Sequence, residues 1–466
     1  MSDCFRATLR YRQMNLYVDQ ILLANGWAKN TSLTIKNGII TNIVSGKLPN
    51  AKCLGTVIPG MVNCHSHAFQ RAFAGFSEQG SEGNDSFWTW RKVMYKFLAK
   101  LTADNAELIA SQLYIEMLKM GYTRVAEFHY LHHDIDGKKY PELATMARAL
   151  FNAAKQSGIG LTLLPVLYQY SGFGNSPANS GQKRFINTVQ QFNQLVSDCF
   201  NIAATVDNSN VGIAPHSLRA VDKSGLQQAV NHVRSLDSKA PIHIHIAEQQ
   251  KEVDDCLAHY GQRPVEWLAN HISLDQHWCL IHATHINEHE QSAIIAKGAI
   301  AGICPTTEAN LGDGIFPTAE FLAQQGTIAI GSDSHISVNP IEELRWLEYA
   351  QRLIKQQRAI LATPQNPSVG ENLWQKAAIG GAQSTSSNTG SLAVGKQADL
   401  LVLDPNKMAL FAHDQQYILD SLMFASQTNM VRDVMVNGHW VIKNGQHQQE
   451  QLVANNFTQM LAQLAS

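Results

Sequence analysis

The stretch TVIPGMVNCH at residues 56–65 is a short apolar run that ends in a histidine, and a second histidine follows at residue 67. Seven further apolar runs follow, and helix-like segments such as 105–121 and 288–298 separate most of them. The seven runs are TRVAEFHY (123–130), GLTLLPVLY (160–168), NVGIAPHS (210–217), PIHIHIAE (241–248), HWCLIHA (277–283), AIAGICP (299–305) and TIAIGSD (327–333). Strand candidates that alternate with helical segments are typical of a parallel (β/α)8 barrel, so we predict this α/β fold for residues 58–388.

An open, doubly wound sheet is the structural alternative for the same pattern. No G-x-G-x-x-G follows the first run, so a dinucleotide-binding sheet lacks its usual sequence support. The placement of polar residues favours the barrel, because strand ends converge on one face of a barrel, where catalysis takes place. The ionisable residues at or near the C-terminal ends of the runs are His65, His129, His216, His245, His282 and Asp333.

Both ends of the chain are β-rich and differ from the middle. Lys-Asn-Gly at 36–38 separates two β-branched runs near the N-terminus, and Asn437-Gly438 separates two runs near the C-terminus. Asn-Gly between such runs predicts a hairpin turn. We predict one small β-sandwich domain built from residues 1–57 and 389–466. The segment 389–466 is expected to end in a helix. Two unrelated hairpins are the alternative.

Composition narrows the class of protein. The chain has 466 residues, 45% of them hydrophobic, and a formal net charge of −2, which argues against binding to nucleic acid. Its seven cysteines form no C-x-x-C and suit a reducing compartment. The N-terminus lacks the apolar core of a signal peptide, and no apolar stretch is long enough to span a membrane. We therefore expect a cytoplasmic, soluble protein.

Histidines at the ends of two runs are the first candidate metal ligands. In His-Ser-His at 65–67, side chains two residues apart lie on the same face of an extended segment, so both imidazoles can reach one ion. His243 and His245 also share a face, and His245 is the better ligand candidate because it lies nearer the strand end. We expect His243 to be a hydrogen-bonded histidine in the barrel interior.

Two carboxylates and a third histidine complete the candidate site. Glu248 lies on the loop after His245, and Asp333 follows the last apolar run. A carboxylate there is costly unless it is paired or bound to metal, although a helix N-cap is an alternative role for Asp333. Asp333 could both bind the ion and accept the proton of an attacking water. His282 ends the sixth run and either binds metal or holds a metal-bound water.

Three imidazoles and one carboxylate form a ligand set that suits zinc, with water in an open position. Zinc lowers the pKa of its bound water to about 7. A second ion would usually need a bridging anionic ligand, and the runs at 160–168 and 210–217 offer none. We therefore predict one zinc ion per chain, held by His65, His67, His245 and Asp333.

Several motifs resemble the amidohydrolase superfamily, and within it the formimidoylglutamate deiminase family. The first resemblance rests on P-G-x-x-N-x-H-x-H at 59–67, G-S-D at 331–333 and the tail GSLAVGKQADLLVLDP at 390–405. The second runs over essentially the whole chain. Its most specific stretches are PGMVNCHSHAFQRAFAG (59–75), EFHYLHH (127–133), APHSLRAV (214–221) and HIAEQ (245–249).

The second resemblance implies a reaction in histidine degradation. N-formimidoyl-L-glutamate and water would give N-formyl-L-glutamate and ammonia. The resemblance implies catalytic roles for Glu248, His282 and Asp333. Glu248 would protonate the imine nitrogen, His282 and Asp333 would align the attacking water, and Asp333 would pass the water's proton to the departing ammonia.

The dianionic substrate needs cationic partners for its two carboxylates. By resemblance these are Arg219, just beyond the fourth run, and Arg91, in the aromatic-rich stretch SFWTWRKVMYKF (86–97). Guanidinium binds carboxylate in bidentate fashion, although a solvated helix face is an alternative for Arg91. The further substrate-binding residues that the resemblance implies are Gln70, Tyr130 and His216. Relatives also suggest a homodimer.

Two other functions stay open from the residues alone. One is a deaminase of the same superfamily that acts on a purine, pyrimidine or triazine ring, whose stacking pocket would not need two arginines. The other is a non-catalytic barrel used for binding or assembly. Such proteins tend to lose metal ligands, whereas this chain retains the full set together with Glu248.

Overall fold

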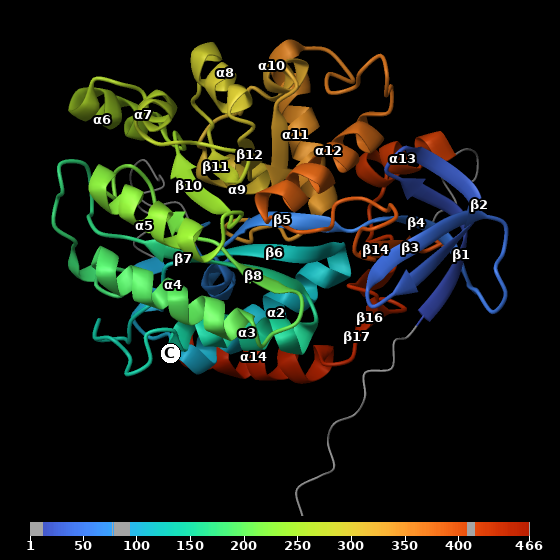
Figure 1. Ribbon diagram of the computed structural model, residues 1–466, viewed down its shortest axis with the longest axis horizontal. Helices are drawn as coiled ribbons and strands as arrows, with labels where there is room; N and C mark the ends of the chain where they lie inside the picture. Colours follow the sequence, from blue (N-terminus) through green and yellow to red (C-terminus); the bar gives the residue numbers. More distant parts are fainter. Residues whose placement is uncertain (1–12, 77, 79–93, 408–414, 466) are drawn as a thin grey trace, which may run out of the picture.

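A computed structural model describes residues 13–76, 78, 94–407 and 415–465 (Figure 1). The predicted substrate ligand Arg91 and most of the stretch at 86–97 lie outside these residues. The described chain forms two parts, a barrel surrounded by helices and a mixed β-sheet at one side of it (Figure 1).

The barrel consists of parallel strands in the order β10-β11-β12-β13-β5-β6-β7-β8. A parallel bridge between Ile213 and Ile242 joins the last strand region to the first and closes the barrel. The strands are β5 (Met61–Ser66), β6 (Tyr122–His129), β7 (Gly160–Leu167), β8 (Ser209–Val211), β10 (Ile242–Ile246), β11 (Trp278–His282), β12 (Ile300–Ile303) and β13 (Thr327–Ile330), with the short β9 (Ala214–Pro215) paired to β7. Each strand lies within or beside one predicted apolar run, so the barrel prediction is confirmed.

Helices cover the outside of the barrel (Figure 1). Their starts follow from local capping: the side chains of Thr102, Thr188 and Asn287 each accept a backbone N–H of the first turn of a helix. The helices are α2 (Ala103–Met120), α3 (Thr145–Ser157), α4 (Val189–Ala203), α5 (Lys223–Leu236), α6 (Gln250–Tyr260), α7 (Pro264–His271), α8 (Glu288–Ala296), α9 (Pro305–Leu311), α10 (Thr318–Ala323), α11 (Pro340–Lys355), α12 (Val369–Ser384), α13 (Ile418–Phe424) and α14 (Glu450–Ala465), with a 3-10 helix η1 (Ala68–Phe73) after β5.

The second part is one mixed sheet in the order β17-β16-β15-β14-β4-β1-β2-β3. Its strands are β1 (Gln13–Leu23), β2 (Gly26–Lys36), β3 (Ile39–Ser45), β4 (Lys52–Pro59), β14 (Leu400–Leu403), β15 (Val431–Val436), β16 (His439–Lys443) and β17 (Gln446–His447). Strand β4 pairs with β1 on one side and with β14 on the other, so segments from both ends of the chain form a single sheet (Figure 1). This confirms that the two β-rich flanks assemble together.

The two predicted hairpin turns are also present. Asn37 and Gly38 have φ values of 51° and 77°, and Asn437 and Gly438 have values of 47° and 75°. Positive φ at both central residues defines the turn that matches the twist of antiparallel strands, and Asn-Gly adopts it readily. The turns connect β2 with β3 and β15 with β16.

The chain passes from the sheet into the barrel at Gly60, between β4 and β5. We predicted one strand over 56–65, and the structure divides this run between the two sheets. A Cβ atom at Gly60 would lie 2.3 Å from Cγ2 of Thr123, so only glycine fits this crossing. The domain boundaries at 57/58 and 388/389 remain our proposal.

The terminal helix α14 lies against barrel helix α2 (Figure 1). Lys119 of α2 and Glu450 of α14 form an ion pair at this contact. The C-terminal segment therefore contributes to the mixed sheet and then returns to the barrel. Among the described residues, no helix combines the length and the apolar character that crossing a membrane requires.

Candidate active site

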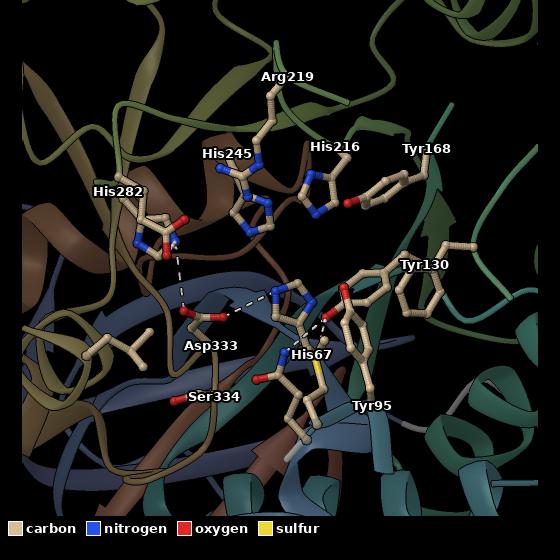
Figure 2. Close-up of a pocket in the computed structure, with 15 residues that line it drawn as sticks. His67, Tyr95, Tyr130, Tyr168, His216, Arg219, His245, His282, Asp333 and Ser334 are labelled. Carbon is tan, nitrogen blue, oxygen red and sulfur yellow. Dashed lines mark hydrogen bonds and ion pairs between the residues drawn. The ribbon is translucent and has the colours of Figure 1, made fainter. Parts of the chain in front are cut away.

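A cavity opens where the strands of the barrel end (Figure 2). Its histidines come from different elements: His67 follows β5, His245 is in β10 and His282 ends β11. Asp333 lies three residues beyond the end of β13. The residues that line the cavity are His67, Gln70, Met94, Tyr95, Tyr130, Tyr168, Phe185, His216, Arg219, His245, Glu248, His282, Leu311, Asp333 and Ser334.

Backbone hydrogen bonds fix the first of these strand ends to the last. The N–H of Asp333 donates to the carbonyl oxygen of His65 at 3.0 Å, and the N–H of His67 donates to the carbonyl oxygen of Asp333 at 3.3 Å. Asp333 has a φ of 45°, a conformation that non-glycine residues adopt only when the surroundings hold them in it. The two segments thus present their side chains at a fixed separation.

The predicted metal ligands lie together. Nε2 of His65 lies 3.0 Å from Nε2 of His245 and 3.4 Å from Oδ1 of Asp333. Nε2 of His67 lies 3.2 Å from the same Asp333 oxygen (Figure 2). Donor atoms at about 2.0–2.2 Å from a tetrahedral zinc ion lie roughly 3.3–3.6 Å from one another. Buried His65, His67 and His245, and buried His65, His282 and Asp333, therefore form groups able to hold a divalent ion.

Hydrogen bonding and burial give the histidines the form that binds metal. The ring Nδ1 of His67 lies 2.9 Å from the carbonyl oxygen of Phe128, so Nδ1 carries the proton and Nε2 is left as an acceptor. Burial lowers the pKa of His65 to about 3 and that of His245 well below its usual value. Neutral imidazole is the form that binds metal.

The electrostatics of Asp333 complement these rings. Burial by itself would raise the pKa of its carboxyl, but the contacts with His65 and His67 outweigh burial and hold that pKa well below its usual value. Asp333 is therefore an anion at neutral pH, which suits both metal binding and acceptance of a proton.

His282 lies between two carboxylates of the cavity. Its Nε2 is 3.8 Å from Oε1 of Glu248 and 3.8 Å from Oδ2 of Asp333. On the other side of the ring, Nδ1 lies 3.2 Å from Oε1 of Glu308. Burial would lower the pKa of His282, but the neighbouring carboxylates, Glu248 first, outweigh it and raise the pKa to about 10.

Known proteins share this arrangement of barrel and sheet. The sequence model of the amidohydrolase family matches residues 56–441. The chain belongs to the amidohydrolase family. It is 48% identical to formimidoylglutamate deiminase of Pseudomonas aeruginosa over 96% of this chain and 99% of that protein, which confirms the resemblance indicated by the motifs.

Solved structures agree with this assignment. The crystal structure of an amidohydrolase from Brucella melitensis has a TM-score of 0.92 and 42% identity, over 97% of this chain and 100% of that one. The crystal structure of atrazine chlorohydrolase from Arthrobacter aurescens complexed with zinc has a TM-score of 0.80 and 17% identity, over 96% of this chain and 100% of that one. The second likeness concerns the fold.

The substrate-binding residues predicted for this amidohydrolase line the cavity, apart from Arg91, which lies outside the described residues. The amide Nε2 of Gln70 donates to the hydroxyl of Tyr130 at 3.1 Å. Arg219 and His216 approach the same space from the loop after β9 (Figure 2). Three of the four predicted metal ligands thus line one cavity, together with both carboxylates predicted to be catalytic and a cation that could bind a substrate carboxylate. The fourth ligand, His65, is buried in contact with His245 and Asp333.

Two other histidines show how far strand position alone predicts a role. His243 hydrogen-bonds through Nε2 to the carbonyl oxygen of Ser384 at 2.7 Å, so the predicted interior role is confirmed. His129 ends β6 but does not line the cavity, and its ring packs edge-on against His132 with centroids 5.4 Å apart. Its place at a strand end had suggested that it faces the site.

Glu308 and Glu127 of this amidohydrolase are buried carboxylates next to the site that were not predicted from the sequence. Glu308 of α9 faces His282, and its Oε1 also accepts the N–H of Cys304 at 2.8 Å. Glu127 of β6 accepts the hydroxyl of Ser66 and the N–H of Ala68, each at 2.6 Å, so it holds the segment that carries His67. A charged residue within the apolar run 123–130 was the available signal for Glu127.

Aromatic lining was missed as well. Tyr95, Tyr168 and Phe185 line the cavity together with the predicted Tyr130 (Figure 2). The rings of Tyr130 and Phe185 meet edge to face with centroids 4.9 Å apart. These residues lie far apart in the sequence and share no motif, so only the folded chain shows that they form one wall.

Proposed function

We propose that this amidohydrolase is a formimidoylglutamate deiminase, which converts N-formimidoyl-L-glutamate and water to N-formyl-L-glutamate and ammonia. One observation carries the proposal: a single buried cavity holds Glu248 and Asp333, beside a cluster of histidines, with Arg219 at its edge. The end-to-end likeness to the Pseudomonas aeruginosa deiminase supports the substrate. A linear amidine with two carboxylates matches a site that has two acids and at least one guanidinium.

We propose one zinc ion per chain, held by His65, His67, His245 and Asp333. The spacing of their donor atoms, the burial of the rings and the single anion fit a zinc site. Bound zinc would lower the pKa of a water molecule to about 7 and so supply hydroxide near neutral pH. The likeness in fold to a barrel crystallised with zinc is consistent with this metal.

The protein's own acids would move the protons. As the water oxygen bonds to the amidine carbon, Asp333 accepts one water proton and Glu248 protonates the imine nitrogen, which becomes an amino group. Asp333 then gives its proton to this nitrogen, and the carbon–nitrogen bond breaks to release ammonia. The remaining hydroxyl proton returns to Glu248 as the formyl carbonyl forms. Both acids end in their starting states, so the cycle is balanced.

His282 would orient the reacting oxygen. Its Nε2 lies 3.8 Å from an oxygen of each catalytic acid, so it borders the space between them. The contact between Nδ1 and Oε1 of Glu308, at 3.2 Å, holds the ring so that Nε2 faces this point.

The substrate's carboxylates would define its orientation. Arg219 would bind one of them, and Gln70, Tyr130 and His216 would complete the contacts. Arg91 stays our proposed partner for the second carboxylate. The homodimer that relatives suggest also stays a proposal, which light scattering would test.

An aromatic-ring deaminase is the second candidate, and one observation favours it. Tyr95, Tyr130, Tyr168 and Phe185 line the cavity, and such rings could stack on a planar base. A buried guanidinium beside the catalytic acids has no obvious role with an uncharged base, so Arg219 favours the dianionic substrate.

Turnover of defined compounds separates the two candidates. The zinc-loaded protein should release ammonia from N-formimidoyl-L-glutamate in a 1:1 ratio with N-formyl-L-glutamate, measured by coupled assay and chromatography. Guanine and cytosine should give no ammonia. Activity on either base together with none on N-formimidoyl-L-glutamate would overturn the proposal.

A further inference from the structure

Glu252 is a buried acid next to the cavity that the mechanism above does not use. It lies in the first turn of α6, and 1% of its side chain is exposed. A carboxylate so far from solvent is stable only when charged or hydrogen-bonding groups surround it. The identity of those groups therefore indicates what Glu252 does.

One oxygen of Glu252 contacts two residues of the site. Oε2 accepts the backbone N–H of Glu248 at 3.3 Å. The same Oε2 lies 3.7 Å from Nη1 of Arg219, whose side chain is 10% exposed. Glu252 thus lies between the residue assigned to protonate the substrate and the residue assigned to bind its carboxylate.

The backbone that Glu252 holds is strained. Ala247, directly before Glu248, has a φ of 51°, and left-handed backbone is unfavourable for a residue with a Cβ atom. The carbonyl oxygen of Ala247 accepts the N–H of His285 at 3.0 Å, and Glu252 holds the following N–H. These two contacts on either side of the turn direct the side chain of Glu248 into the cavity.

Arg219 depends on the same carboxylate. Among the residues that the structure describes, Glu252 is the acid that lies within ion-pair distance of the Arg219 guanidinium. The buried Nε of Arg219 has no hydrogen-bond partner within the part of the chain that the structure describes. A guanidinium held at one nitrogen and unsatisfied at another can donate to an incoming carboxylate without first reorganising.

We propose that Glu252 is a positioning residue that links recognition of the substrate carboxylate by Arg219 to the placement of Glu248. This inference rests on the proposed function. Because one oxygen contacts both partners, a shift of Arg219 toward a bound carboxylate changes the contact that holds Glu248. The carboxylate end of the substrate thereby contributes to the geometry at the reacting carbon, as binding energy from remote groups does in other enzymes.

Two substitutions separate the two contacts. Glu252→Gln keeps an oxygen for the N–H of Glu248 and removes the charge beside Arg219. Glu252→Leu removes both. The substrates to compare are N-formimidoyl-L-glutamate and N-formimidoyl-propylamine, which has the amidine and no carboxylate.

For Glu252→Gln we expect kcat/KM on N-formimidoyl-L-glutamate to fall about tenfold, mainly through KM, because Arg219 loses its orienting charge. On N-formimidoyl-propylamine the variant should match the parent within about twofold, since no carboxylate is bound. Glu252→Leu should lower kcat on both compounds by about 100-fold, since Glu248 is then also displaced.

Asp254→Asn is the matched control, because Asp254 lies on α6, is exposed and accepts a hydrogen bond from the side chain of Gln250, one helical turn earlier. It should leave both substrates unaffected. The zinc content of every variant should equal that of the parent. A second readout does not need turnover: affinity for the product N-formyl-L-glutamate, measured by calorimetry, should fall about tenfold in Glu252→Gln.

An equal loss on both compounds in Glu252→Gln would mean that Glu252 only supports the fold. Unchanged preference for the carboxylate substrate and unchanged product affinity would also overturn the inference. Failure of the proposed function looks different, because the parent protein itself would then not release ammonia from N-formimidoyl-L-glutamate.

Discussion

Nδ1 of His282 lies 3.2 Å from Oε1 of Glu308, on the side of the ring that faces away from the other acids of the cavity. Glu308 is 4% exposed and lies in the first turn of α9, a helix that begins at Pro305. A carboxylate at Nδ1 fixes the ring's orientation and leaves Nε2 directed at the space between Glu248 and Asp333. His282 is therefore placed by an acid outside the cavity lining.

Replacing Glu308 should slow catalysis without emptying the metal site. Glu308→Leu should lower kcat by about 100-fold and Glu308→Gln by about tenfold, because the amide oxygen of glutamine still accepts a hydrogen bond from Nδ1–H. Steady-state kinetics and zinc analysis of the purified variants provide the test. A Glu308→Leu variant with the kcat of the parent would show that His282 needs no partner.

Asp333→Asn should reduce turnover by at least about 1,000-fold, because an amide cannot accept the proton of the attacking water. The measurement is ammonia release at saturating substrate. Ser334→Ala, one residue along the same loop, is the control for local folding. The thermal unfolding midpoints of the two variants should be similar. Near-normal activity of Asp333→Asn would exclude this residue as the base.

Glu248→Gln should retain zinc and lose between about 100-fold and 10,000-fold in kcat, because the amide has no proton to give to the imine nitrogen. Elemental analysis and kinetics on the same preparation distinguish the two effects. If the variant lost its metal, Glu248 would be a ligand and not the acid.

Arg219→Met should raise KM for N-formimidoyl-L-glutamate by about 100-fold and change kcat much less, since the guanidinium binds a carboxylate that does not react. Methionine fills much of the same volume without the charge. Initial rates over a wide range of substrate concentration give both constants. An unchanged KM would place Arg219 outside the binding site.

A buried acid between the two parts of the molecule predicts a pH effect on stability. Burial raises the pKa of Asp399 to about 6, although its Oδ1 accepts the N–H of Asn437 at 2.7 Å. The folded state therefore binds this proton more tightly than the unfolded chain. That contribution to stability is complete below about pH 4 and is lost as pH rises through about 6.

Asp399→Asn keeps the acceptor for Asn437 and cannot ionise. Relative to the parent, its free energy of unfolding should rise between pH 4 and pH 7 by about 2 kcal/mol. Urea denaturation at several pH values measures this difference. A difference between variant and parent that stays constant with pH would show that Asp399 keeps an ordinary pKa in the folded state.

Periodicity and strand-end chemistry predicted most of the fold and the central cluster. Apolar runs locate barrel strands because both faces of a parallel strand are buried. The run at 56–65 was the exception, since a single apolar stretch serves two sheets and only the close approach of Gly60 to Thr123 marks the break. Hairpins at Asn37 and Asn437 were predictable because their turn type requires Asn-Gly.

The residues that support the site could not be predicted in the same way. Glu308, Glu252 and Glu127 are polar residues whose roles depend on partners far along the chain or across a turn. His129 shows the converse, because its position at a strand end suggested the site and its ring points elsewhere. The position in a strand determines where the backbone of a residue lies. The direction of its side chain depends on the loops and rings that surround it.

Anomalous diffraction at the zinc edge, from crystals of the zinc-loaded protein, tests the central claim most directly. We predict one peak per chain at about 2.0–2.2 Å from donor atoms of four residues. These residues are His65, His67, His245 and Asp333. A peak held by other side chains, or zinc-loaded crystals in which this cluster binds no metal, would contradict the account.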